Sequence, residues 1–312
     1  MNRLRTAIVL LMILAIAAVC GCARRHMASM PAAPPQEPGR SEETAAAQPP
    51  EVPKATVRVL VPCGLASSFR DISLQIPEDM PDISFRTRVL PVVEMTDKVL
   101  AEEIGGDVFA SLGYKEIERL QEAGKLVEGS VRNIARFRLA LIAGRGNPHG
   151  IARLEDLTKP AVKHVTMPPP HENSVGYYTQ GVLRKAGLWD KLEPKLVYPE
   201  DSAQVIKYMR EGWADAAVVY DTCLIETYTP TGDPKGTEGV VDKIGMIDPA
   251  LYPTMHAPAG ILTTATDVDA ANRVIEYLMS DRVAAITARY GYLPAEEGGA
   301  PPETTAERAG PR

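Results

Sequence analysis

The stretch TVRVLVPCGLASSFRDISLQIPEDMPDISFRTRVL, residues 56–90, decides the fold class. It opens with a β-rich run at Val57–Val61, continues with helical spacing over Leu65–Ile76, and ends with strand-like alternation over Ile83–Leu90. We expect the helix to stop near Pro77, because proline lacks a backbone donor and clashes with the preceding turn. A strand, a helix and a second strand in this order are typical of α/β proteins.

The same alternation continues along the chain to residue 290. Further strands are expected at Asp107–Ala110, Phe137–Ala143, Ala214–Tyr220 and Gly260–Thr264. Further helices are expected at Val92–Ile104, Tyr114–Ala123, Ser174–Ala186, Ser202–Arg210 and 267–290. Alternation at this spacing predicts α/β with mainly parallel sheets flanked by helices. Because the 312 residues exceed one ordinary domain of roughly 100–200 residues, we expect two lobes.

Composition and motifs exclude several classes of function. Apolar residues make up 45% of the chain and charged residues 24%, as in a globular protein with a sizeable core. The formal net charge of −6 argues against a nucleic-acid partner, since such proteins are usually basic. The chain lacks the G-x-S-x-G, H-E-x-x-H and phosphate-loop signatures. We therefore predict a protein that is not an enzyme and needs no cofactor.

The first residues have the features of an export signal, predicted over 1–21. Arg3 and Arg5 precede an apolar run, Ala7–Val19, which is shorter than the roughly 20 residues that span a bilayer. The run ends in VCGC, which resembles a lipobox whose last residue, Cys22, is lipidated after cleavage. We predict a lipoprotein anchored to a membrane through Cys22; a plain secretory signal is the alternative.

Two polar segments frame the folded part. Residues 22–54 are rich in proline and alanine and have little apolar bulk, which predicts a disordered tether. Residues 297–312 form a similar polar tail. The folded part is therefore expected over about residues 55–295.

Short stretches along this folded part carry a family resemblance in their order. They are Asp107–Ser111, Glu122–Leu126, Gly146–Gly150, Leu154–Leu157, Ala186–Leu192, Pro194–Leu196, Ala214–Tyr220 and Arg289–Tyr292. As an ordered set they resemble the periplasmic molybdate-binding proteins of ABC transporters, a branch of the type II periplasmic-binding-protein superfamily. The resemblance covers about residues 55–295.

The resemblance implies a two-lobed fold with the ligand cleft between the lobes. Lobe 1 would hold residues 55–140 and 245–296, and lobe 2 residues 141–244. The implied function is that of a monomeric solute-binding lipoprotein on the periplasmic or cell-surface side. It would bind a small molybdate- or tungstate-like oxyanion and deliver it to the transmembrane subunits of an ABC permease. Hinge closure around the ligand would signal the loaded state.

Oxyanion sites often use helix N-termini, where free N–H groups and the helix dipole favour negative charge. The turn Cys63-Gly64-Leu65 joins a strand to a helix and is such a place. The resemblance implies a serine at the position of Gly64, so here only backbone donors would remain. It also implies ligand contacts from five other positions: Glu94, Ser174, Val175, Ser202 and Tyr220. The alternatives are a solvated glutamate at a helix start for Glu94, which would repel an anion, and a core tyrosine for Tyr220. Val175 would act through its N–H, and Ser174 could instead cap its helix.

The residues that depart from the family pattern gather in the expected pocket. They are metal-ligand types, namely Cys63, Glu94, His171, Glu172 and Cys223. A transition-metal ion or another small ligand is thus an alternative cargo, although no tight metal-binding spacing is present. Cys63 and Cys223 could form a disulfide, bind ligand, or remain buried thiols. A sensor that presents its closed form to a membrane partner is the remaining alternative.

Overall fold

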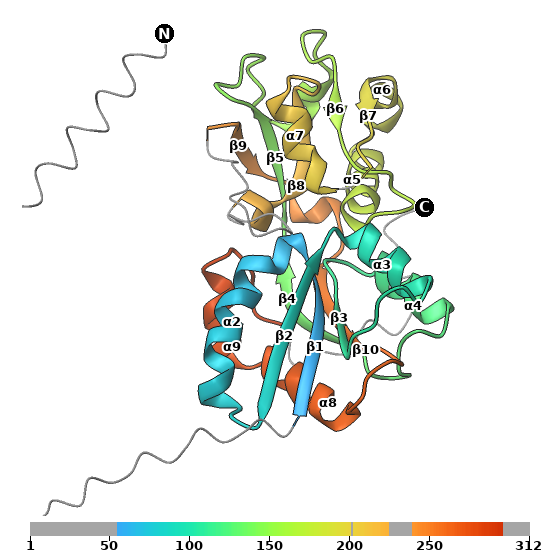
Figure 1. Ribbon diagram of the computed structural model, residues 1–312. Helices are drawn as coiled ribbons and strands as arrows, with labels where there is room; N and C mark the ends of the chain where they lie inside the picture. Colours follow the sequence, from blue (N-terminus) through green and yellow to red (C-terminus); the bar gives the residue numbers. More distant parts are fainter. Residues whose placement is uncertain (1–54, 201, 225–238, 296–312) are drawn as a thin grey trace, which may run out of the picture. The chain divides into compact units, whose positions relative to one another are not determined.

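Strands and helices alternate through a computed structural model that describes residues 55–200, 202–224 and 239–295 (Figure 1). The predicted signal peptide with Cys22, the tether and the C-terminal tail all lie outside the described residues. Of the helices in the described part, none has the length and apolar character needed to span a bilayer. The α/β prediction is confirmed.

The first lobe is built on a five-stranded sheet whose strands come from both ends of the folded chain. These strands are β1 (Ala55–Pro62), β2 (Ile83–Leu90), β3 (Val108–Ala110), β4 (Arg132–Phe137) and β10 (Met255–Ile261). Their order is β2-β1-β3-β10-β4. β1 pairs in parallel with β2 and β3, whereas β10 runs antiparallel to β3 and β4.

The second lobe contains another five-stranded sheet, in the same unit of the chain. Its strands are β5 (Leu139–Gly144), β6 (Val165–Thr166), β7 (Leu196–Val197), β8 (Ala216–Tyr220) and β9 (Val241–Met246). Their order is β7-β6-β8-β5-β9, with β6 parallel to β7 and β8, and β5 antiparallel to β8 and β9. By sheet membership this lobe runs from Leu139 to Met246, whereas the sequence placed it at 141–244.

Both sheets are mainly parallel, as predicted, but each contains one antiparallel strand, β10 in the first sheet and β5 in the second. In each sheet the antiparallel pairs involve strands that carry the chain between the lobes: β4 leads into β5, and β9 leads back into β10. A parallel neighbour needs a crossover connection within its own lobe. A strand that arrives directly from the other lobe has no such connection.

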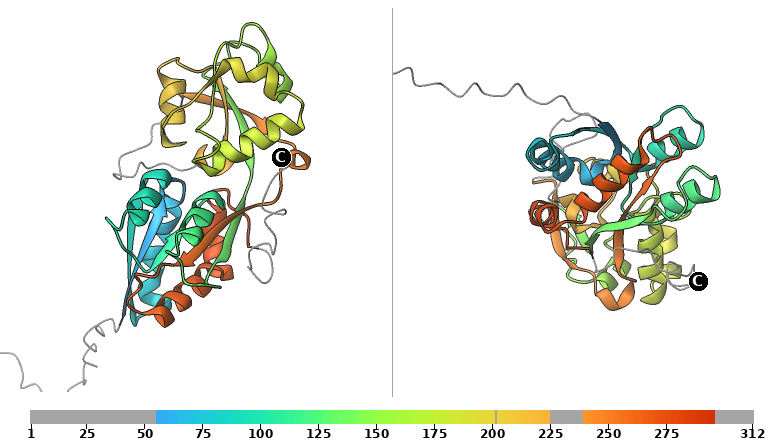
Figure 2. Two further views of the ribbon diagram at one scale, coloured as in Figure 1. Left: turned by 90° about the vertical axis from the view of Figure 1, so that its right-hand side faces the viewer. Right: turned by 90° about the horizontal axis from the view of Figure 1, so that it is seen from below.

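Side chains along β1 point in turn to one face of the first sheet and to the other. Val57, Val59 and Val61 pack with α2 (Ala66–Asp79), α8 (Val268–Leu278) and α9 (Asp281–Ala288). Leu60, on the opposite face, packs with α3 (Val92–Leu100) and α4 (Lys115–Glu122). Figure 2 shows α2 beside α9 on one side of this sheet and α3 with α4 on the other. The N-terminal ends of α2 and α3 follow β1 and β2 at the edge that faces the second lobe.

The second sheet is covered in the same way. On β8, Val218 belongs to the core shared with α5 (Ser174–Lys185), and Val219 to the core shared with α7 (Val205–Arg210). The short helix α6 (Trp189–Leu192) follows α5 and contacts it. α5 and β8 therefore present their ends toward the first lobe, where the candidate site lies.

Helix α2 continues two residues past Pro77, to Asp79, where the sequence predicted a stop. Proline disturbs the turn that precedes it, and here it lies in the last turn of the helix. The Met80 N–H still donates to the Ile76 carbonyl at 2.7 Å. Pro77 therefore lies within the helix and does not end it, contrary to the prediction.

The run Phe137–Ala143, predicted as one strand, belongs to two strands in two sheets. β4 ends at Phe137 and β5 begins at Leu139, so a single residue, Arg138, separates these two strands. Its guanidinium pairs with the buried Asp221 carboxylate at 3.1 Å, and the Asp221 N–H donates to the Arg138 carbonyl at 2.9 Å. These two contacts connect Arg138, the residue between the two sheets, to Asp221, which directly follows β8.

Candidate functional site

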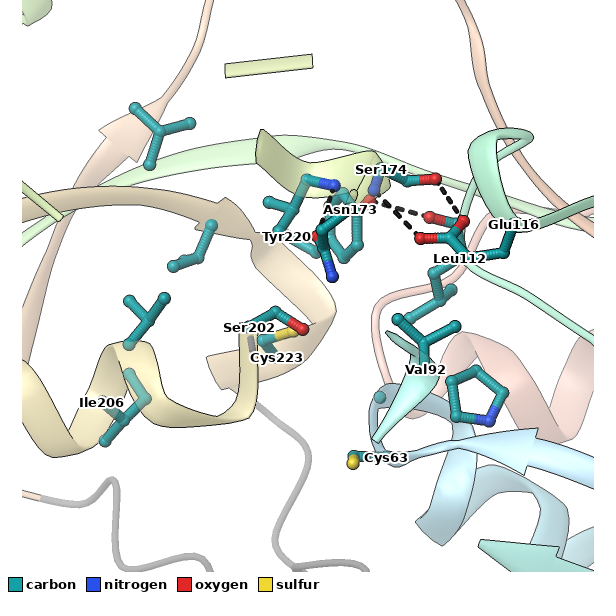
Figure 3. Close-up of a pocket in the computed structure, with 16 residues that line it drawn as sticks. Cys63, Val92, Leu112, Glu116, Asn173, Ser174, Ser202, Ile206, Tyr220 and Cys223 are labelled. Carbon is teal, nitrogen blue, oxygen red and sulfur yellow. Dashed lines mark hydrogen bonds between the residues drawn. The ribbon is translucent and has the colours of Figure 1, made fainter. Parts of the chain in front are cut away.

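A cavity lies between the two lobes and encloses about 660 Å³ of empty space, part of it open to solvent (Figure 3). The first lobe contributes Pro62, Cys63, Gly64, Val92, Leu112 and Glu116. The second lobe contributes Asn173, Ser174, Val175, Ser202, Val205, Ile206, Val218, Val219, Tyr220 and Cys223. The walls are mainly aliphatic, with a few polar groups at the ends of secondary-structure elements.

On the first lobe, the cavity begins at the 3₁₀ turn η1 (Cys63–Leu65), which leads into α2. Pro62 precedes this turn and supplies no side-chain cap. Tyr292 stabilises this turn, because its hydroxyl donates to the Gly64 carbonyl at 2.6 Å. A Cβ on residue 64 would lie 2.5 Å from Leu112 Cδ1. The Leu112 side chain therefore occupies the space that a serine at this position would need.

On the second lobe, the cavity begins at the N-terminal end of α5. Asn173 is the N-cap residue, and its Oδ1 accepts the Val175 N–H at 3.0 Å. From the sequence, Ser174 was a candidate for the N-cap of this helix, whereas in the structure the N-cap is the preceding residue, Asn173. The Val175 N–H, which the sequence offered to the ligand, is thus engaged by the cap.

Ser174 bonds to a carboxyl group of the other lobe. Its N–H donates to Glu116 Oε1 at 3.0 Å, and its hydroxyl bonds Oε2 of the same carboxyl group. The Ser111 hydroxyl donates to Oε2 at 3.1 Å. Burial raises the pKa of Glu116 above its usual value, although the hydrogen bonds from Ser174 and Ser111 act in the opposite direction. A carboxyl group from α4 therefore occupies the N-terminal end of α5.

Gly113 makes this approach between the lobes possible. Its φ is +122°, and a Cβ there would lie 2.5 Å from both Cβ and Oγ of Ser174. Only glycine adopts this conformation without strain, and only glycine leaves room for the serine. The Lys115 N–H also reaches Ser174 Oγ, at 3.3 Å.

Tyr220 forms a second polar link between the lobes. Its hydroxyl donates to the Leu112 carbonyl at 2.7 Å, and its ring packs edge-on against Phe137, with centroids 4.5 Å apart. Burial raises the pKa of Tyr220 well above its usual value, so the hydroxyl keeps its proton and remains a donor. The hydroxyl that the sequence assigned to the ligand is engaged by a backbone carbonyl.

Tyr220→Phe is expected to destabilise the protein by about 1–3 kcal/mol, because it leaves the buried Leu112 carbonyl without its donor. The measurement is urea unfolding at neutral pH. Tyr198→Phe is the matched control, since Tyr198 is 44% exposed and should change stability by less than about 0.5 kcal/mol. Equal midpoints for the two variants would mean that the link contributes nothing.

The structure brings six of the eight predicted ligand residues to the cavity. Those six are Cys63, Gly64, Ser174, Val175, Ser202 and Tyr220. Leu65 is fully buried behind the lining, in the core with α2. Glu94 lies outside the lining, where it is exposed and pairs with Lys98 at 2.8 Å. It behaves as a solvated residue in the first turn of α3.

The alternative metal set is not brought together. Cys63 and Cys223 both line the cavity, and the structure shows them as thiols without a disulfide. His171 is 77% exposed and contacts Glu172 at 3.2 Å, away from the lining. Within the described ranges, no group of three histidine, cysteine, aspartate or glutamate residues is placed to hold a metal ion.

Among the lining residues that the sequence missed, Leu112, Glu116 and Asn173 take part in the contacts described above. A local signal existed for Asn173, because asparagine before a helical run is a common N-cap. No local signal distinguishes Glu116, which stands among other charged residues in the segment KEIERLQE. Its place in the cavity follows from the contact between α4 and α5.

Comparisons with known proteins agree on one family and one fold. The family model described as bacterial extracellular solute-binding protein matches residues 57–293. The chain is 25% identical to a putative ABC transporter substrate-binding lipoprotein of Bacillus subtilis, YvgL, over 62% of this chain and 70% of that protein. It is 27% identical to the molybdate-binding protein ModA of Azotobacter vinelandii, over 76% of this chain and 90% of that protein.

Among solved structures, the sulfate-binding protein SubI of Mycobacterium tuberculosis matches with a TM-score of 0.65 at 13% identity. The match covers 79% of this chain and 89% of that one. At this identity the likeness concerns the fold alone, and it agrees with the two-lobed α/β architecture.

Proposed function

The chain belongs to the bacterial extracellular solute-binding protein family, and from this premise we propose that it is the substrate-binding lipoprotein of an ABC transporter. It takes a small oxyanion, of the molybdate or tungstate kind, into the cavity between its lobes and delivers it to a membrane permease. A lipid on Cys22 holds it on the outer side of a membrane. Membership of a solute-binding family agrees with the prediction that the chain is not an enzyme.

One observation carries the proposal: the cavity opens at the N-terminal ends of two long helices from different lobes, α2 through η1 and α5. Such ends carry the positive end of the helix dipole, which favours an anion. At α5 the Ser174 and Val175 N–H groups already donate to Glu116 and Asn173, so this helix contributes its dipole. No side chain caps η1 or α2 at the N-terminus. The local field of the two helix ends thus suits an anionic ligand, although the chain as a whole is acidic.

The raised pKa of Glu116 removes an objection to anion binding. Among the described residues that line the cavity, Glu116 is the one acidic residue, and a charged carboxylate there would repel an oxyanion. Burial favours its neutral form. The name of one relative, the molybdate-binding protein of Azotobacter vinelandii, also favours an oxyanion as cargo.

The test is a thermal-shift titration of residues 23–312 with molybdate, tungstate, sulfate and phosphate. An oxyanion at about 100 times its Kd should add about 2.7 kcal/mol to the free energy of unfolding. Ser202→Phe places a large ring in the cavity and should abolish the shift. Glu94→Gln is the control, because Glu94 lies outside the lining and its loss should leave the shift intact. A wild-type protein that responds to none of the four anions would rule out this cargo.

A further inference from the structure

Asn173 carries a buried donor that no group of the described chain satisfies. The residue is 2% exposed and lines the cavity, and its Nδ2 has no hydrogen-bond partner. Its other amide atom, Oδ1, accepts the Val175 N–H. The two halves of this side chain therefore have different environments.

The N-cap fixes which amide atom faces the cavity. An N-cap side chain must offer an acceptor to the first turn of its helix, so Oδ1 has to point toward the Val175 N–H. The orientation of the amide is therefore set by the helix and cannot be reversed without losing the cap. Figure 3 shows the amide nitrogen of Asn173 directed into the space between the lobes.

Capping alone does not account for an asparagine at this position. Aspartate and serine cap helices about as well, and neither leaves an amide donor in a buried place. An unmet donor in a buried site is unfavourable, and buried polar groups usually have partners. An oxygen atom of a bound solute would satisfy this donor.

The donors of three neighbouring residues, Ser174, Val175 and Tyr220, are already engaged by the protein. The N–H and hydroxyl of Ser174 bond to Glu116, and the Tyr220 hydroxyl donates to the Leu112 carbonyl. The Val175 N–H donates to the cap itself. A solute oxygen that reaches the end of α5 can thus accept a hydrogen bond from Asn173 Nδ2, which has no partner in the described chain.

We propose that Asn173 is a specificity-determining residue, whose Nδ2 donates a hydrogen bond to an oxygen of the bound solute. This inference rests on the proposed function, since it takes the cavity as the solute site. It adds that the solute is recognised on the second lobe by a neutral amide donor. The solute must therefore present an oxygen acceptor to the end of α5.

Two variants test this role, with the same four oxyanions as probes and isothermal titration as the measurement. Asn173→Asp keeps the capping oxygen and replaces the donor by a second acceptor. Asn173→Ser keeps a capping oxygen and removes the amide without adding charge. We expect unfolding midpoints of the unliganded variants close to that of the wild type. We expect the Kd of the best oxyanion to rise about tenfold or more in Asn173→Ser, and further in Asn173→Asp.

The outcomes separate the two proposals. If the wild type binds an oxyanion and both variants bind it with the same Kd, the role of Asn173 is refuted while the proposed function stands. If the wild type binds none of the four, the oxyanion cargo fails and the acceptor assigned to Asn173 fails with it. A rise in Kd accompanied by an equal loss of unliganded stability would show that Asn173 acts only as a helix cap.

Discussion

Gly176→Ala is expected to destabilise the protein by about 1–3 kcal/mol or more, although alanine normally favours a helix over glycine. Gly176 lies in the first turn of α5, and a Cβ there would lie 2.3 Å from the Pro168 carbonyl oxygen and 3.0 Å from that of Pro169. Both contacts are with backbone, which cannot move aside as a flexible side chain can. The helix would have to shift away from the Pro168–Pro169 segment, and the capped end beside the cavity would move with it.

The same helix provides the matched control. Gly181 has nothing within 4 Å of its Cβ position, so Gly181→Ala should stabilise the protein by about 0.5–1 kcal/mol through helix propensity alone. Urea unfolding of both variants measures the difference, and anion titration shows whether the displaced end of α5 weakens binding. Stabilisation by both substitutions would contradict the close packing of α5 on the Pro168–Pro169 segment.

Glu116→Gln is expected to stabilise the protein at neutral and alkaline pH, by an amount that grows as the pH rises. The glutamine amide has the shape of the carboxyl group, can accept the Ser174 N–H and can donate to a serine hydroxyl. It thus replaces the neutral acid, while wild-type Glu116 must lose its proton inside the protein as the pH rises. The pKa of Glu116 in the folded state is raised by burial above the ordinary value of 4.5.

The sign of the effect follows from proton binding. Between the ordinary pKa and the raised one, the folded protein holds a proton on Glu116 that the unfolded chain has lost. Stability therefore falls with rising pH in this window, by about 1.4 kcal/mol per pH unit relative to Glu116→Gln. Below the ordinary pKa both states are protonated, so wild type and variant should differ least there.

Urea unfolding from about pH 4 to pH 8 measures this difference. Glu122→Gln removes an exposed carboxylate from the end of the same helix and should stay within about 0.5 kcal/mol of the wild type. Parallel stability curves for wild type and Glu116→Gln across the range would mean that Glu116 is not the buried acid described here. The same titration in the presence of the best oxyanion would show whether binding also weakens as Glu116 ionises.

Local patterns in the sequence determined most of the secondary structure. The strand at Ile83–Leu90 was predicted with its observed bounds, and the helix predicted from Ser174 begins at Ser174. Alternation of apolar residues and helix-start residues are local signals, which depend on neighbours within a few positions. The largest error concerned Arg138, where one apolar run continues through two strands of different sheets.

Local sequence patterns could not predict the direction in which each strand runs. β10 pairs with β3 and β4 although more than a hundred residues separate it from them, and it runs antiparallel to both. Its direction depends on the chain's return from the second lobe, which no window of sequence records. The mainly parallel sheets that alternation predicted are confirmed, but the one antiparallel strand in each sheet was therefore not predicted.

The sequence by itself determined the fold class and which segments present their ends to a site, including the turn at Gly64 and the start of α5. Only the tertiary structure decided what those ends meet. Glu116 and Ser174 stand 58 positions apart, and Tyr220 stands 108 positions from Leu112. Their contacts depend on how two lobes close on each other, and burial at that closure sets the state of Glu116 and leaves the amide of Asn173 open. A side chain's chemistry is written in the sequence, but its partners and its exposure to water are properties of the packed structure.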